Sequence, residues 1–187
     1  MKKIVLLACL AMALTACNSK PDPLESALIE AMTRDIDQPC KIQVRDLEKI
    51  DSTNFATEFK RRLSIYEIRM DQNTARLEKY IKQGMKSNAT KVFGDLQRDT
   101  KIYNELIGLK EMMADDTLKT AYYDYTFVYH GKVGKQRISA KRAYFTVTPD
   151  GRVLTYGNEQ KQIHKATGLA IPGYQELLDS FKEKEEE

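Results

Sequence analysis

Three cysteines and two histidines are the side chains of this chain best suited to covalent or metal chemistry. A catalytic thiol needs a base beside it, and a zinc site needs several cysteine, histidine or carboxylate ligands. Nothing in the spacing pairs His130 with His164, and Cys40 has no base close to it in sequence. We therefore expect no catalytic residue, no metal site, no cofactor and no enzyme activity, and we interpret Cys40 as a small buried hydrophobic residue.

Cys17 closes a segment with the layout of an export signal. Met1–Lys3 carry positive charge, Ile4–Leu14 form an unbroken apolar run, and small residues then precede the cysteine. This order is typical of a cleaved secretory signal. The run of 11 residues is much shorter than the roughly 20 that a membrane-spanning helix requires.

The four residues Leu14-Thr15-Ala16-Cys17 resemble the lipobox of bacterial lipoproteins. The resemblance implies that residues 1–16 are removed and that Cys17 receives a diacylglyceryl group, often with a further acyl chain such as palmitate on its amine. Two or three acyl chains hold a protein durably at a membrane where one chain binds marginally. Residues 17–22 would then form a lipidated tether in the cell envelope. In Gram-negative lipoproteins an aspartate after the cysteine favours retention in the inner membrane, so the resemblance implies that Asn18 favours the outer membrane. The alternative is an ordinary secretory signal with an incidental cysteine.

Charge and cysteine number narrow the class of the mature protein. The net charge of +3 would fall to +1 on loss of Lys2 and Lys3, which argues against nucleic acid as a partner. Cys9 would leave with the signal and Cys17 would carry the lipid, so Cys40 would have no partner for an intrachain disulfide.

The body begins with a predicted short helix and a strand. Asp22 and Pro23 are suited to a helix start, and the helix should extend to Ile36 before Pro39 ends it. Apolar and polar residues then alternate over Cys40–Ile50, which predicts a strand. The alternation slips at Arg45-Asp46, which indicates a β-bulge or an early strand end.

Residues 55–114 carry the most distinctive pattern, a heptad stripe in two halves separated by Gln83–Lys86. The stripe positions are Phe59, Leu63, Tyr66, Met70, Asn73, Leu77 and Tyr80, then Ala89, Val92, Leu96, Asp99, Tyr103, Leu106, Lys110 and Met113. Two helices of similar length joined by a tight turn form an antiparallel hairpin. Each arm of about 28 residues would be about 42 Å long.

Folding back at residues 84–85 places Asp99 near Met70, within reach of Arg69 or Asn73. The seam should therefore hold a polar patch halfway along its length, a feature that can fix helix register at a cost in stability.

Four-residue spacings on the first helix join opposite charges. Glu58 with Arg62, and Glu78 with Lys82, have the spacing of exposed ion pairs that support a helix. We expect both pairs to lie on the solvent side of the hairpin.

The remaining chain changes to strand periodicity. Strands are predicted from Tyr123 to His130, from Ile138 to Thr148 and from Arg152 to Tyr156, with a hairpin loop at Gly131–Gly134. A helix over residues 158–168 and a last helix with Tyr174, Leu177, Leu178 and Phe181 inward should follow, before a charged tail at 182–187.

These elements together predict an α+β fold, with a small antiparallel sheet packed with helices and carrying the long helical hairpin as an insertion. The single domain would span residues 23–181, with the hairpin at 55–114. The order of a helix and strand followed by a strand meander is similar to cystatin-like and NTF2-like modules. The body also resembles small envelope lipoproteins of Gram-negative anaerobes, a resemblance that implies no activity.

Two surface features are candidates for binding. The strands are rich in tyrosine, which indicates either a cross-strand aromatic core or a cleft for an apolar or glycan ligand. The candidate ligand-binding residues are Tyr123, Tyr125, Tyr129, Tyr144 and Tyr156. The neighbouring hairpin is basic, which favours either a solvated loop or contact with anionic lipid or glycan. Its basic residues are Lys132, Lys135, Arg137, Lys141 and Arg142.

Asp51-Ser52-Thr53 and Asp116-Thr117-Leu118 resemble sites that are O-glycosylated in envelope proteins of some Gram-negative bacteria. The resemblance implies glycans on Ser52 and Thr117, at the junctions of hairpin and body. The functional hypothesis that fits these patterns best is a protein-interaction or scaffold module, attached to a membrane through the lipid on Cys17 and using the 55–114 hairpin to contact a protein partner. The competing hypothesis is a small-ligand-binding lipoprotein that uses the tyrosine-rich cleft.

Overall fold

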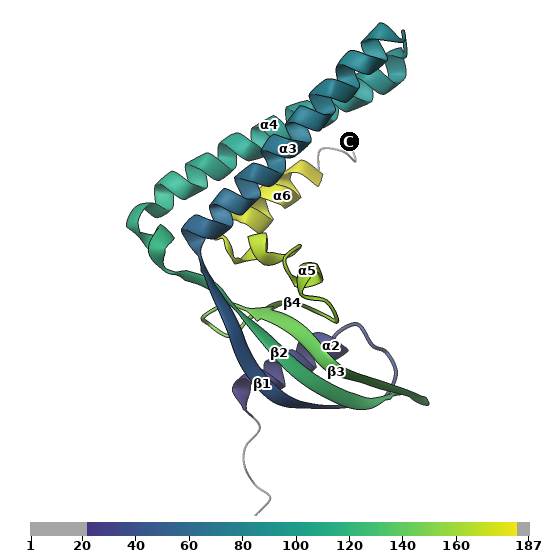
Figure 1. The fold of residues 1–187 in the computed structure, drawn as a ribbon, viewed down its shortest axis with the longest axis vertical. Helices are drawn as coiled ribbons and strands as arrows, with labels where there is room; N and C mark the ends of the chain where they lie inside the picture. Colours follow the sequence, from purple (N-terminus) through teal and green to yellow (C-terminus); the bar gives the residue numbers. More distant parts are fainter. Residues whose placement is uncertain (1–21, 183–187) are drawn as a thin grey trace, which may run out of the picture.

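The computed structural model describes residues 22–182 and confirms the α+β class (Figure 1). The predicted signal segment 1–16, the lipidation site Cys17 and residues 183–187 of the tail lie outside the described residues. The longer elements are α2 (Pro23–Thr33), β1 (Cys40–Asn54), α3 (Phe55–Lys82), α4 (Lys86–Met113), β2 (Thr120–Val133), β3 (Gln136–Val147), β4 (Val153–Gly157) and α6 (Tyr174–Lys182). The short elements are η1 (Ala114–Leu118), α5 (Gln160–Ile163) and η2 (Thr167–Ala170).

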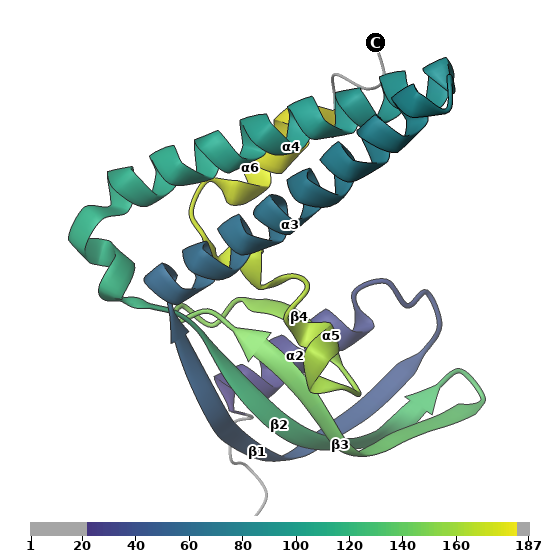
Figure 2. The same cartoon turned by 45° about the horizontal axis from the view of Figure 1, so that its top comes forward.

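The four strands form one antiparallel sheet in the order β1-β2-β3-β4. The sheet is strongly curved, and α2 packs across one of its faces (Figure 2). The buried side chains of this contact are Leu28, Met32, Val44, Phe127, Ala143, Phe145 and Val147. As predicted, Asp22 caps α2, since its Oδ1 accepts a hydrogen bond from the Leu24 amide at 2.8 Å. The helix ends earlier than expected because the Ile36 amide donates to the Thr33 carbonyl in a turn, at 3.0 Å.

The bulge predicted in β1 is confirmed. The register with β2 shifts between Arg45 and Glu48, and Asp46 has a positive φ of 53°. The strand then continues beyond Ile50 to Asn54, because its last residues pair with the tyrosine-rich start of β2. Asn54 caps the next helix by accepting a hydrogen bond from the Thr57 amide at 2.9 Å.

The β2–β3 hairpin is longer than the sequence pattern indicated. Residues Gly131–Val133, predicted as a loop, lie within β2 because they pair with Cys40–Ile42 of β1. The turn shrinks to Gly134-Lys135, where Gly134 has a φ of +55°. Gly131 is required by a close approach of backbones: a Cβ atom there would lie 2.2 Å from the Lys41 carbonyl oxygen.

We expect Gly131→Ala to lower the free energy of unfolding by about 1–3 kcal/mol, since the methyl group would force β1 and β2 apart. Urea denaturation followed by circular dichroism measures the change. Gly108→Ala is the control: beyond the backbone of its own helix and its chain neighbours, no atom lies within 4 Å of its added Cβ. Alanine in a helix interior should raise stability by about 0.5–1 kcal/mol. Equal effects of the two substitutions would contradict the backbone contact.

The helical hairpin is confirmed as an insertion between β1 and β2. α3 and α4 have 28 residues each and fold back at Gly84. The Phe55 amide donates to the Lys119 carbonyl at 3.1 Å and closes the base of the hairpin. The turn end of the hairpin extends beyond the rest of the described chain (Figures 1 and 2), and residues 70–99 are here called its distal half.

The polar patch in the hairpin seam is also confirmed. Asp99 is completely buried, and its Oδ1 lies 2.8 Å from Nη2 of Arg69. The Asn73 side-chain amide donates to Asp99 Oδ2 at 3.4 Å. Burial raises the pKa of Asp99 above its ordinary value of 3.8, although Arg69 acts in the opposite direction.

We expect Asp99→Asn to change how stability depends on pH. Because Asp99 holds a proton more readily in the folded than in the unfolded state, its ionisation lowers the free energy of unfolding as the pH rises above about 3.8. The variant should lack this decrease, so its stability relative to the natural chain should increase with pH over this range. Urea denaturation of both proteins across a pH series measures the difference, and identical pH slopes would refute the expectation.

The C-terminal segment departs most from its prediction. In place of one helix over residues 158–168, it forms the single turn α5 and the 3-10 turn η2. The carbonyls of His164 and Lys165 accept hydrogen bonds from the Arg62 guanidinium, so they do not continue a helix. The last helix, α6, is confirmed, and it packs against the proximal half of the hairpin.

The contact of α6 with the hairpin contains a second core. Its buried members are Phe59, Tyr66, Ile102, Leu106, Ile171 and Tyr174. The hydroxyls of Tyr66 and Tyr174 lie 3.0 Å apart, and burial raises the pKa of Tyr174. This core fixes the base of the hairpin to the C-terminal part of the domain.

Candidate functional site

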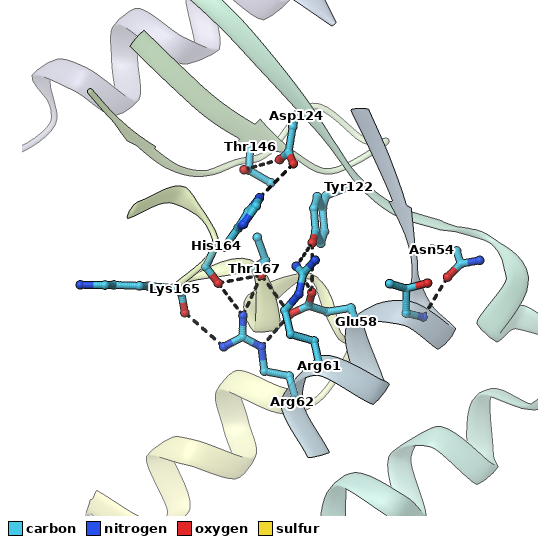
Figure 3. A network of polar contacts seen from close by, with 11 residues as sticks. Asn54, Glu58, Arg61, Arg62, Tyr122, Asp124, Thr146, His164, Lys165 and Thr167 are labelled. Carbon is cyan, nitrogen blue, oxygen red and sulfur yellow. Dashed lines mark hydrogen bonds and ion pairs between the residues drawn. The ribbon is translucent and has the colours of Figure 1, made fainter. Parts of the chain in front are cut away.

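A buried polar network joins the hairpin to the sheet, centred on the Glu58 carboxylate (Figure 3). Oε1 of Glu58 accepts hydrogen bonds from Arg62 Nε at 2.6 Å and from Thr167 Oγ1 at 2.9 Å. Oε2 accepts hydrogen bonds from Arg61 Nη1 and from the Tyr122 hydroxyl, both at 3.0 Å. The carboxylate thus has four donors, which come from α3, β2 and η2.

Arg62 extends the network toward the C-terminal segment. Its Nη2 donates to the His164 carbonyl at 2.8 Å and to Thr167 Oγ1 at 2.7 Å, and its Nη1 donates to the Lys165 carbonyl at 3.2 Å. Gly168 permits this approach, because a Cβ there would lie 2.8 Å from Arg62 Nε. Four of the five guanidinium N–H groups therefore donate to protein partners.

The prediction that Glu58 and Arg62 form an exposed pair is wrong. The pair forms, but Glu58 is completely buried and Arg62 is almost so. Burial also raises the pKa of the neighbouring Tyr122, which keeps its phenol as a hydrogen-bond donor to Glu58. Since no ligand can reach a completely buried carboxylate, the network is a structural joint. Glu78 and Lys82 are exposed, as predicted.

Beside this joint, His164 faces a carboxylate. Its Nε2 lies 3.3 Å from Oδ2 of Asp124, whose Oδ1 accepts a hydrogen bond from Thr146 Oγ1 at 2.7 Å. His130 lies exposed toward the opposite end of β2, so the fold does not bring the two histidines together.

Within residues 22–182, no group of three or more His, Cys, Asp or Glu side chains is arranged to hold a metal ion. Cys40 is half-buried with a free thiol.

The five candidate tyrosines do not gather around one hollow. Tyr123, Tyr125 and Tyr129 pack against the core between the sheet and α2. Tyr144 pairs with Thr126 and lies on the opposite face of the sheet. Tyr156 is exposed and lines a shallow hollow of about 230 Å³ beside the end of α2. That these tyrosines bind a ligand stays a prediction.

A cluster of basic side chains with a hollow between them lies at the end of the sheet away from the hairpin. Cross-strand pairing puts Lys41, Lys132 and Arg137 in one row over β1, β2 and β3. The next row on the same face is polar and consists of Gln43, His130 and Ser139. Together with Gly131 and Ile138, these six residues line a hollow of about 500 Å³, here called the basic hollow. The basic hairpin was visible in the sequence, but the contribution of Lys41 depends on strand pairing.

Large apolar side chains are exposed on the distal half of the hairpin. Ile81 is 64% exposed, Phe93 is 48% exposed, and Met85 lies exposed in the turn between the helices. The candidate glycosylation residues lie near the hairpin base: Ser52 is exposed on β1, and the Thr117 hydroxyl donates to the Ala114 carbonyl.

None of the helices in the described part of the chain combines the length and apolar character needed to span a membrane. Comparison of the whole chain with protein-family models, with curated proteins and with solved structures finds no match.

Proposed function

We propose that this chain is a lipid-anchored protein of the bacterial cell envelope, attached through acyl chains on Cys17 in the outer membrane, and that it acts as an interaction or scaffold module. Its hairpin contacts a protein partner. The Leu14-Thr15-Ala16-Cys17 pattern supports the anchor, and the shape of the domain supports the role.

One observation carries the proposal. The described chain begins at the sheet, where α2 starts, and the distal half of the hairpin lies at the opposite end of the molecule (Figure 1). A tether of a few residues from Cys17 would therefore hold the sheet near the membrane and direct the hairpin away from it. This orientation suits a protein that reaches a partner.

The construction of the hairpin supports the same role. Its base is fixed by the Glu58 network and by the core around Phe59 and Leu106, so its direction relative to the sheet is set. Among residues 22–182, neither the Glu58 network nor that core includes a residue of its distal half, which exposes Ile81, Met85 and Phe93. Exposed apolar side chains of this size are common at protein interfaces.

Cross-linking in intact cells, followed by purification of the full chain, tests the proposal. The natural chain should capture a protein that Ile81→Ser/Phe93→Ser loses. The matched control is Met112→Ser/Leu118→Ser, which removes two apolar side chains exposed near the hairpin base and should retain the partner. The same captured proteins with all three chains would refute a role for the distal half.

A further inference from the structure

The basic hollow has an arrangement of charge that is unfavourable without a ligand. Lys41, Lys132 and Arg137 are directly opposite one another on adjacent strands, and like charges in that position destabilise a sheet. Among the ion pairs of residues 22–182, none involves any of these three side chains. All three are exposed, and no carboxylate lines the hollow.

The second row supplies hydrogen-bond donors beside the charges. The Gln43 amide, the His130 imidazole and the Ser139 hydroxyl lie on the same face, one row farther along the strands. A phosphate group accepts several hydrogen bonds at once and is bound by arginine forks and lysine ammonium groups. Strands are about 4.8 Å apart, so the row of cations extends over about 10 Å. This width suits more than one phosphate better than a single small ion.

The place of the hollow indicates where those phosphates come from. It lies at the end of the sheet away from the helical hairpin, on the face opposite α2, and α2 also begins at the end of the molecule away from the hairpin (Figure 1). On the proposed function, this end of the sheet faces the membrane to which Cys17 is attached. Anionic lipid headgroups attract clustered lysine and arginine at such a surface.

We propose that the basic hollow binds the phosphates of anionic phospholipid headgroups and so sets the orientation of the domain on the membrane. That the hollow binds phosphate depends on the residues of the hollow alone. That these phosphates belong to membrane lipids rests on the proposed function.

Vesicle co-sedimentation tests the proposal with residues 18–187, so that neither the apolar segment Ile4–Leu14 nor an acyl chain on Cys17 contributes to binding. The chain should bind vesicles that contain phosphatidylglycerol and should bind vesicles of phosphatidylcholine alone much more weakly. Lys41→Gln/Lys132→Gln/Arg137→Gln should weaken binding to the first vesicles at least about tenfold, and added salt should weaken binding of the unsubstituted chain. Circular dichroism checks the folding of every variant. If the triple variant folds poorly, the single change Lys132→Gln tests the hollow in its place.

The matched control removes the same charge elsewhere. Lys60→Gln/Lys82→Gln/Lys86→Gln changes three exposed lysines of the hairpin and should retain vesicle binding. Equal binding by both triple variants would overturn the proposal. Binding of soluble pyrophosphate at the hollow without vesicle binding would overturn the membrane source and identify a soluble phosphate ligand. If membrane attachment of the natural chain persists while the hollow binds no vesicle, the lipid anchor stands and this inference fails.

Discussion

Glu58→Ala is expected to lower the free energy of unfolding by about 3–5 kcal/mol, the range found when one partner of a buried ion pair is removed. The substitution leaves Arg62 buried without its carboxylate, and it also removes the acceptor for Tyr122 and Thr167. Arg62 keeps its hydrogen bonds to the His164 and Lys165 carbonyls, but its Nε and the hydroxyls of Tyr122 and Thr167 each lose the Glu58 acceptor, which adds a desolvation cost. Urea denaturation followed by circular dichroism measures the loss.

A second acidic residue on the same helix provides the control. Glu78 is exposed, so Glu78→Ala should change stability by no more than about 0.5 kcal/mol. Glu58→Met/Arg62→Met should be more stable than Glu58→Ala, because it removes both buried charges together. If Glu58→Ala and Glu78→Ala had equal effects, the joint between hairpin and sheet would not be the one described.

Phe145→Ala should have an effect of similar size in the other core, about 3–5 kcal/mol. Phe145 is completely buried on β3, its ring stacks on Tyr125 at a centroid distance of 5.1 Å, and it meets Phe127 edge-on at 5.5 Å. Truncation leaves a cavity between the sheet and α2. The midpoint of urea denaturation should fall, with the slope of the transition unchanged.

Phe93→Ala makes the same chemical change at an exposed position of α4. It should alter stability by less than about 1 kcal/mol, since little apolar area returns to water. A small effect of Phe145→Ala, close to that of Phe93→Ala, would mean that the tyrosine-rich face of the sheet is loosely packed. That result would favour the cleft interpretation of Tyr125 over the core interpretation.

Local patterns predicted the hairpin and its register. The stripe from Phe59 to Tyr80, the break at Gly84 and the second stripe define two helices that fold back on each other. Placing Asp99 opposite Met70 required no more than counting back from the turn, and the contact of Asp99 with Arg69 follows from it. The bulge at Asp46 was equally visible, as a slip in alternation.

Features that depend on distant partners were not predictable in this way. Glu58 and Arg62 have the spacing of an exposed pair, and nothing nearby in sequence signals that Tyr122 and Thr167 cover them. The same contacts end the predicted helix over residues 158–168, because Arg62 takes its carbonyl groups. The basic hollow likewise needs the pairing of Lys41 with Lys132, which only the strand register defines.

The most direct test of the proposed anchor is mass spectrometry of the N-terminal peptide of the mature protein, purified from bacterial cells that express the full chain. We predict a first residue Cys17 that carries a diacylglyceryl group, with residues 1–16 absent and the protein in the membrane fraction. A mature chain recovered in the soluble fraction, with an unmodified thiol on Cys17, would contradict the anchor and with it the orientation of the hairpin.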